Sequence, residues 1–453
     1  MSLNTDPARE SAPVRTTSIT DPYGPRSWHS RLIQLSGKNR ALNEFSVERV
    51  GEEVEQNLVL LHGYGAGLGF FYKNFEGLSR VKGWKLYALD MLGMGRSSRP
   101  PFKIHAKDQQ GKITEAENWF IDALEEWRIL KKIDKFTLLG HSLGGYMAVA
   151  YALKYPGHLN KLILASPVGI PEDPYAMQAD MPEPGDSTMA NEFIQDQEDD
   201  IVNKSGNLKT SGDNNNFLNA RSKAESASQN KTQDQPQRRP LPKWLTYLWD
   251  ANISPFSIVR WSGPLGPRFV SGWTTRRFSH LPENESEALH HYAYSLFRQR
   301  GSGEYALAYI LAPGAFARSP LIRRIHGVGR QPIQSPAQLP QKADDTASSS
   351  SSPTTQSLKR ETGIPIVMMY GENDWMDIAG GFAAEQRLKE EKAKVLKSAT
   401  EEEKKRENGS AKVLVIKKAG HHVYLDGWEE FNEVMREEME ETSRQTKKSN
   451  GKL

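Results

Sequence analysis

Short apolar runs alternate with longer amphipathic segments along this chain. The runs lie at residues 57–61, 85–90, 136–139, 162–165, 364–370 and 413–417. Continuous apolar runs of this length are typical of parallel strands that are buried on both faces. Residues 114–132 instead place Trp119, Phe120, Leu124 and Trp127 at helical spacing, as expected for an amphipathic helix. The pattern predicts an α/β fold with a mostly parallel, doubly wound sheet.

Polar segments interrupt this pattern and indicate how the chain is organised. Only 37% of the residues are apolar, below the roughly 45–50% of a compact domain. Two segments rich in Ser, Asn, Gln and Asp have the composition of disordered insertions. The division we predict is a disordered leader (1–40), the first part of the core (41–176), a disordered insertion (177–240), a lid (241–330), a second disordered insertion (331–361), the second part of the core (362–440) and a tail (441–453).

Composition narrows the classes of function. The net charge is only +3 and the basic residues are spread along the chain, which argues against nucleic acid as a partner. Without cysteine the chain holds neither disulfides nor thiolate metal sites. No apolar run reaches the ~18 residues of a membrane-spanning helix, so we expect an intracellular protein in peripheral contact with membranes. The N-terminal arginines faintly resemble a mitochondrial presequence that acidic residues and prolines interrupt. A mitochondrial and a cytosolic location therefore both stay open.

A candidate nucleophile lies between the third apolar run and a helical stretch. Residues 140–144 read Gly-His-Ser-Leu-Gly, which matches G-x-S-x-G. In this motif the serine lies on a sharp strand-to-helix turn, and glycines on either side let neighbouring chains approach closely. The pattern alone is weak evidence, but the preceding strand and following helix make it specific. We expect Ser142 to be a catalytic nucleophile.

The turn after the first strong strand is a candidate oxyanion hole. It reads His62-Gly63-Tyr64-Gly65. A backbone N–H from this turn and the N–H of the residue after the nucleophile are the usual pair of donors. We therefore expect Leu143 and either Tyr64 or Gly65 to supply the two donors. An ordinary glycine-rich turn is the alternative.

The remaining catalytic residues are expected late in the chain, with the acid before the base. His421 directly follows Gly420 after the last apolar run and is the candidate base. An exposed pair with His422 is the alternative, and no carboxylate cluster suggests a metal there. The preceding strand is followed by two candidate acids, Asp374 and Asp377. Asp374 has the more usual placement, and Asp377 remains an alternative.

Together these motifs resemble one α/β-hydrolase subfamily. The matching segments are LLHGYGAGLGFFYKNF, ALDMLGMGRSSRP, LLGHSLGGYMAVAYALKYP, LILASPVGIPEDP, YGENDWMD and AGHHVYLD. The subfamily includes the animal lipid-droplet lipase coactivator, N-acyl phospholipid lipases, plant phospholipases and the fungal mitochondrial cardiolipin-specific deacylase, and the fungal branch is the most similar. The resemblance implies Ser142 as nucleophile, His421 as base and the YGENDWMD segment as the source of the acid. In the coactivator the nucleophile is replaced by asparagine, whereas serine stands here.

The resemblance also implies an acyltransferase-like motif, His-x-x-x-x-Asp, formed by His421 and Asp426. Because His421 is already the candidate base, this motif is not an independent second site. An acyl-enzyme on Ser142 passes its acyl group either to water or to a lysolipid hydroxyl. Capping of the helix that begins near Trp428 is the alternative role for Asp426.

These observations favour a serine hydrolase that deacylates membrane phospholipids, with cardiolipin as one candidate, and releases fatty acid and lysophospholipid. Two alternatives are a lysophosphatidic acid acyltransferase with acyl-CoA as donor and a non-catalytic scaffold that activates a separate lipase. The complete set of serine, histidine and acid argues against the scaffold. No metal or other cofactor is predicted.

The lid combines aromatic and basic residues, as surfaces that bind anionic bilayers do. The candidate substrate- or membrane-binding residues are Trp249, Trp261, Trp273, Arg276 and Arg277. For any single aromatic residue the alternative is packing inside the lid's own core. Arg318, Arg323 and Arg324 are further candidates for contact with a lipid phosphate.

Overall fold

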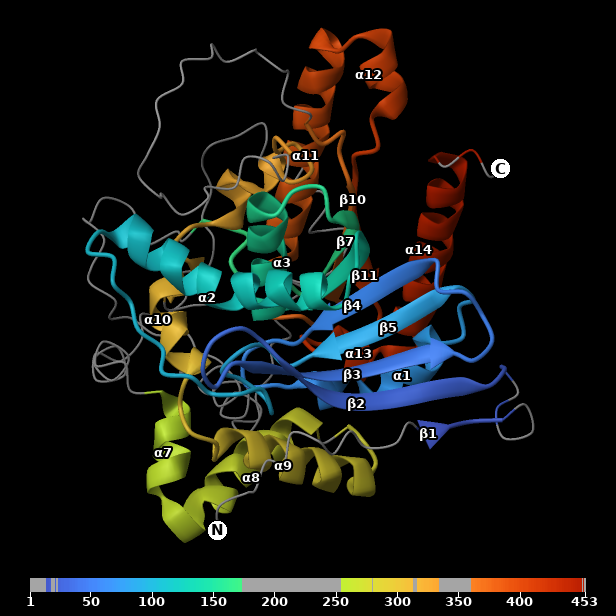
Figure 1. Cartoon of the computed structure of the whole chain (residues 1–453). Helices are drawn as coiled ribbons and strands as arrows, with labels where there is room; N and C mark the ends of the chain where they lie inside the picture. Colours follow the sequence, from blue (N-terminus) through green and yellow to red (C-terminus); the bar gives the residue numbers. More distant parts are fainter. Residues whose placement is uncertain are drawn as a thin grey trace, which may run out of the picture.

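The computed structural model describes residues 14–17, 21, 23–172, 254–278, 280–312, 316–333, 360–449 and 451. Within them, nine strands form one sheet in the order β1-β2-β3-β5-β4-β6-β7-β10-β11 (Figure 1). The six strands from β5 to β11 in this order are parallel, and β1, β2 and β3 are antiparallel to their neighbours. The strands are β1 (Val14–Arg15), β2 (Arg26–Gln34), β3 (Ala41–Arg49), β4 (Gln56–Leu61), β5 (Trp84–Leu89), β6 (Phe136–His141), β7 (Leu159–Ala165), β10 (Pro365–Gly371) and β11 (Ser410–Ile416).

The mostly parallel sheet predicted from the apolar runs is confirmed. Each predicted strand is present, with ends that differ by three residues or fewer. The reason is burial on both faces: every residue of β6 and of β10 is buried. A short hairpin, β8 (Leu311–Ala312) with β9 (Phe316–Ala317), lies outside the main sheet.

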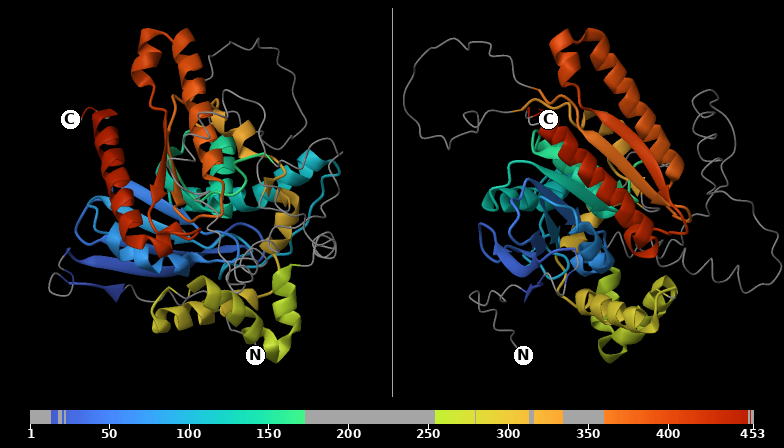
Figure 2. Two further views of the ribbon diagram at one scale, coloured as in Figure 1. Left: turned by 180° about the vertical axis from the view of Figure 1, so that it is seen from behind. Right: turned by 90° about the vertical axis from the view of Figure 1, so that its right-hand side faces the viewer.

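Helices cover both faces of the sheet, with α2 and α3 on one face and α1 and α14 on the other (Figures 1 and 2). The predicted amphipathic helix is α2, which begins after Asp108, whose side chain accepts a hydrogen bond from the N–H of Gly111. Its apolar stripe, which includes Phe120 and Trp127, is buried against the sheet. The helices are α1 (Tyr72–Leu78), α2 (Gln109–Leu130), α3 (Leu143–Lys154), α7 (Pro255–Trp261), α8 (Gly266–Phe278), α9 (Glu283–Phe297), α10 (Leu307–Ile310), α11 (Ile378–Ser398), α12 (Glu401–Arg406), α13 (Val423–Asp426) and α14 (Trp428–Ser449).

A buried ion pair fixes the last helix to the centre of the sheet. Lys161 of β7 has no exposed surface, and its Nζ lies 2.7 Å from a carboxylate oxygen of Glu438 and 3.0 Å from one of Glu441. A charged group taken out of water requires a close partner of opposite charge. The ion pair therefore adds to the apolar packing of Phe431, Met435 and Met439 in holding α14 on this face.

Helices α7, α8 and α9 form a cap that lies outside the sheet (Figure 2). The cap has its own small core, in which Trp273 and Phe256 each pack on Phe297 at ring separations of 5.3 and 4.4 Å. This region is part of the predicted lid. No helix in the described part of the chain combines the length and apolar content needed to cross a membrane.

The prediction of a disordered leader at residues 1–40 is wrong for the second half of that range. β2 (Arg26–Gln34) lies within residues 1–40 and pairs with β3 over nine residues. The strand was not predicted because its sequence is polar. Several of its side chains point to solvent, and Arg26 is buried in an ion pair with Asp21. The insertion predicted at residues 177–240, and most of that at 331–361, lie outside the described residues.

Candidate active site

Ser142 lies on a strained turn between β6 and α3. Its backbone has φ 51° and ψ −116°, and its N–H donates to the carbonyl of Ala165 at 3.0 Å. A positive φ is costly for a residue with a β-carbon and persists only where the surroundings enforce it. The turn makes Ser142 the residue before the first turn of α3, so the helix N-terminus and the N–H of Leu143 lie beside its side chain.

Close backbone crossings explain the glycines around this serine. A β-carbon at position 140 would lie 2.2 Å from the carbonyl oxygen of Gly144, and one at position 144 would lie 2.6 Å from that of Leu61. A β-carbon at position 63 would lie 3.0 Å from the β-carbon of Ser142. Only glycine fits at these three positions, and the turn after β4 is thereby held against the nucleophile turn.

The turn after β4 is fixed by a buried histidine. His62 donates from Nδ1 to the carbonyl of Gly63 at 2.7 Å and accepts at Nε2 from the N–H of Met91 at 3.1 Å. Complete burial lowers the pKa of His62, which keeps the ring neutral in this arrangement. Tyr64 and Gly65 follow, and the ring of Tyr64 stacks on Phe256 of the cap at 5.1 Å. The predicted oxyanion turn therefore lies between the nucleophile turn and the cap.

The imidazole of His421 is hydrogen-bonded to Asp374. Nδ1 of His421 lies 3.1 Å from Oδ1 of Asp374, and both side chains are buried. Because an ionised carboxylate only accepts, Nδ1 carries the proton and Nε2 is left with its lone pair. Nε2 is buried and has no hydrogen-bond partner among the described residues. This arrangement suits a general base, because the lone pair of Nε2 is available to accept a proton.

Asp377, the alternative acid, lies elsewhere. Its side chain is exposed and accepts a hydrogen bond from the N–H of Ala379 at 2.9 Å, which caps the N-terminus of α11. Asp374 instead turns inward, and its Oδ1 also accepts from the N–H of Met376 at 3.0 Å. The structure thus brings Asp374, and not Asp377, to His421.

His141, the residue before the nucleophile, links the Ser142 turn to the loop of His421. Its Nε2 donates to the carbonyl oxygen of His421 at 3.0 Å, and the two rings lie 4.8 Å apart. Burial, followed by the proximity of His421, lowers the pKa of His141 well below its usual value. The turn of Ser142 and the loop of His421 are therefore in direct contact. We missed this role in the sequence because the position between the glycine and the serine carries no chemical signal in the motif.

The loop of the candidate base is also tied to the cap. Arg277 of α8 donates from Nε and Nη2 to Nδ1 of His422, at 3.0 and 2.9 Å. Burial, with Arg277 nearby, lowers the pKa of His422 well below its usual value, so this ring is a neutral acceptor. His422 is 7% exposed, so a solvent-exposed histidine pair is not what the structure contains.

Asp426 of the acyltransferase-like motif makes a second contact with the cap. One oxygen accepts from the N–H of Gly420 at 3.1 Å, and the other lies 3.1 Å from Nε2 of His280. Its carboxylate therefore points back to the loop that precedes His421, and these contacts differ from the predicted capping of α14. The two residues of the motif have different partners, Asp374 for His421 and His280 for Asp426.

The predicted lid residues separate into different environments. Trp261 is 72% exposed, whereas Trp273 is buried in the cap core. Phe278 and Phe297 cover the ring of Trp273, which is the packing inside the lid's own core that was the alternative for a single aromatic residue. Arg277 also points inward, to His422. Trp249 and the side chain of Arg276 lie outside the described residues.

The other arginines considered for lipid phosphate have partners within the protein. Arg324 pairs with Glu117 and donates to the hydroxyl of Tyr146 at 2.6 Å. Arg323 pairs with Glu172 at 2.7 Å. Arg318 donates to the carbonyl of Ala308 at 2.8 Å. The guanidinium of Arg324 is thus engaged in a part-buried network with Glu117 and Tyr146, and contact of these arginines with a lipid phosphate stays a prediction.

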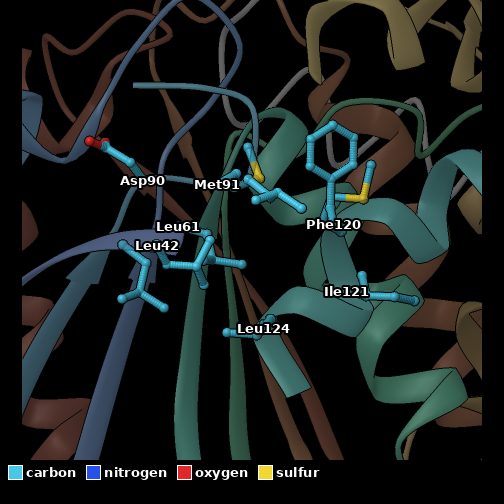
Figure 3. Close-up of a pocket in the computed structure, with 10 residues that line it drawn as sticks. Leu42, Leu61, Asp90, Met91, Phe120, Ile121 and Leu124 are labelled. Carbon is cyan, nitrogen blue, oxygen red and sulfur yellow. The ribbon is translucent and has the colours of Figure 1, made fainter. Parts of the chain in front are cut away.

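A small apolar void lies between the sheet and α2 (Figure 3). It has a volume of about 10 Å³, close to that of one water-sized sphere. Its lining residues are Leu42, Leu61, Leu89, Asp90, Met91, Leu92, Phe120, Ile121, Leu124 and Met147. Neither Ser142 nor His421 reaches it, so this void is a packing defect and not a site for an acyl chain.

Comparison with known proteins agrees with this geometry. Residues 56–427 match the alpha/beta hydrolase fold family. The chain is 30% identical to the 1-acylglycerol-3-phosphate O-acyltransferase of Arabidopsis thaliana over 78% of this chain and 63% of that protein. It is 28% identical to the 1-acylglycerol-3-phosphate O-acyltransferase ABHD5 of Mus musculus over 91% and 85% of the two chains. It is 26% identical to the (Lyso)-N-acylphosphatidylethanolamine lipase of Bos taurus over 84% and 78%.

These relatives are of the kinds that the sequence motifs resembled, and the matched region includes all three residues of the serine, histidine and acid set. The chain spans less than two thirds of the length of the Arabidopsis relative. Similarity to the fungal branch stays a prediction. The match over residues 56–427 establishes that this chain belongs to the α/β-hydrolase fold family.

Proposed function

We propose that the protein is a serine hydrolase that deacylates glycerophospholipids through an acyl-enzyme on Ser142. The observation that carries the proposal is the hydrogen bond between Asp374 and Nδ1 of His421, which leaves Nε2 as a buried acceptor in a loop that is hydrogen-bonded to the residue before Ser142. A serine hydroxyl is a weak nucleophile until such a base accepts its proton.

In the proposed mechanism, Nε2 of His421 takes the proton of Ser142 Oγ as this oxygen attacks the ester carbonyl. The N–H groups of Leu143 and of Tyr64 or Gly65 stabilise the oxyanion. The Asp374 carboxylate stabilises the imidazolium. Collapse of the tetrahedral intermediate breaks the ester bond, and His421 returns the proton to the lysolipid oxygen. Water then attacks the acyl-enzyme by the same steps and releases the fatty acid.

The phospholipid class is supported by the names of relatives that act on 1-acylglycerol-3-phosphate or on N-acylphosphatidylethanolamine. Cardiolipin is the candidate that the resemblance to the fungal branch adds. A panel of vesicles that contain phosphatidylcholine, phosphatidylethanolamine, phosphatidic acid or cardiolipin, with products identified by mass, tests this choice.

The Ser142→Ala variant tests the mechanism. Removal of the nucleophile should lower fatty-acid release by about a thousandfold or more. Ser398→Ala, at an exposed position near the end of α11, is the matched control and should keep wild-type activity. If Ser142→Ala keeps the same melting temperature and also keeps its activity, the proposed mechanism is wrong.

Acyl transfer to 1-acylglycerol-3-phosphate is a second candidate, because the Arabidopsis and mouse relatives carry that name. In chemical terms, the acyl-enzyme would pass its acyl group to a lysolipid hydroxyl instead of water. Labelled acyl-CoA incubated with 1-acylglycerol-3-phosphate should then yield labelled phosphatidic acid, and His421→Ala should abolish this product. Labelled free fatty acid alone would favour hydrolysis.

A further inference from the structure

The cap exposes a group of large apolar side chains close together in the sequence. Four of the eleven exposed large hydrophobic residues in the described ranges fall between positions 258 and 269. We call these four the cap ridge: Ile258 (43% exposed), Trp261 (72%), Leu265 (57%) and Phe269 (56%). They lie at the junction of α7 with α8, where these helices contact each other and the chain turns (Figure 1). Such a group of exposed apolar side chains is unusual unless it contacts something.

The charged residues within the segment that carries the cap ridge are all basic. Residues 254–278 contain four arginines and no aspartate or glutamate. Arg268 is exposed next to Phe269, whereas Arg260 pairs with Glu304 at 2.7 Å and Arg277 donates to His422. An apolar group beside an exposed arginine is complementary to an anionic lipid surface.

The cap ridge is one short helix away from the candidate oxyanion turn. Phe256, near the start of α7, stacks on Tyr64, and a β-carbon at Gly65 would lie 3.6 Å from its ring. Trp261, at the end of the same helix, belongs to the ridge. Seven residues of α-helix span about 10 Å. Whatever binds the ridge is therefore held close to the turn that faces Ser142.

We propose that the cap ridge inserts into the interface of an anionic phospholipid bilayer and holds the Tyr64 side of the active site against that membrane. Indole rings favour the boundary between headgroups and acyl chains, and arginine pairs with lipid phosphate. Four side chains supply only part of the ~800 Å² per partner that a stable protein interface buries, so a second copy of the chain is the weaker occupant. The inference deepens the proposed function, and it rests on that function only in that the bound membrane would supply the phospholipid substrate.

Sedimentation with vesicles tests the inference without turnover. The full chain is mixed with vesicles of phosphatidylcholine alone or with phosphatidylglycerol added. We expect the wild type to bind the anionic vesicles, and the triple variant Trp261→Ser, Leu265→Ser, Phe269→Ser to bind them at least about tenfold more weakly. The double variant Ile129→Ser, Leu130→Ser removes exposed apolar side chains at the end of α2 and should bind as the wild type does.

A charge variant measures the electrostatic contribution to vesicle binding. Arg268→Gln should weaken binding to anionic vesicles by about fivefold at low salt, whereas Arg406→Gln, at an exposed position in α12, should not. Hydrolysis of a short soluble ester should be unchanged in all of these variants, so a failed catalytic proposal and a failed membrane proposal give different results.

Three outcomes would overturn the inference. They are no binding of the wild type to anionic vesicles, equal binding by the triple variant, and a dimer in lipid-free solution that dissociates in the triple variant. The last result would assign the ridge to a second copy of the chain.

Discussion

The loop of His421 contacts the cap through His422 and Arg277, whereas the cap ridge is an exposed part of the cap. The side chains of these two regions have opposite environments. Around His421 the side chains are buried, and hydrogen bonds to Asp374 and from His141 fix the loop while Nε2 of His421 is left without a partner among the described residues. On the ridge, Trp261 and Phe269 are exposed and have no polar role. The comparison teaches that this chain separates chemistry, which needs fixed geometry, from binding, which needs accessible apolar surface.

The largest expected effect concerns the acid. Asp374→Asn should lower kcat about a thousandfold or more, because the amide stabilises the wrong tautomer of His421 and leaves its cation unsupported. Asp377→Asn is the matched control, since asparagine caps a helix about as well as aspartate. Initial rates with a soluble ester measure both variants. Equal losses in the two would mean that Asp374 is not the acid.

Two features of the site illustrate what the sequence does and does not determine. The Ser142 turn is predictable because its glycines and flanking strand and helix are local in sequence. The choice between Asp374 and Asp377 is not, because it depends on which carboxylate faces a histidine some 47 positions later in the chain. Similarly, Phe269 and Trp273 are one helical turn apart on α8, and the packing of Phe278 and Phe297 on Trp273 separates an exposed from a buried side chain.

The buried histidines predict a pH dependence of stability. Burial lowers the pKa of His62, His141 and His422 in the folded state. The unfolded chain therefore binds more protons as pH falls through the unfolded pKa of about 6.5, and the free energy of unfolding decreases toward acid. Each histidine contributes at most ~1.4 kcal/mol per pH unit.

Urea unfolding at pH 7.5 and 5.5 measures this dependence. We expect lower stability at pH 5.5 and a smaller difference in His422→Gln. His291→Gln, at a histidine whose side chain is 70% exposed, should leave the difference unchanged. Stability that is equal or greater at pH 5.5 would contradict the assignment of these rings as neutral.

A smaller effect is expected at the two contacts between the cap and the loop that carries His421. Arg277→Gln leaves Nδ1 of the buried His422 without its charged donor, which should reduce the free energy of unfolding by about 1–3 kcal/mol. His280→Gln removes a pair whose histidine side chain is 43% exposed, which should cost less than about 1 kcal/mol. Urea unfolding at pH 7.5 gives both values. If His280→Gln costs more, the cap is held mainly at its surface.

The ion pair of Lys161 bears on where this chain tolerates shortening. A chain truncated before Glu438 would lack both carboxylates that pair with Lys161, together with the last turns of α14 that lie against it. Loss of one partner from a buried pair typically costs ~3–5 kcal/mol, a large share of the stability of an ordinary domain. The last turns of α14 therefore contribute to the stability of the sheet, although they follow every catalytic candidate in the chain.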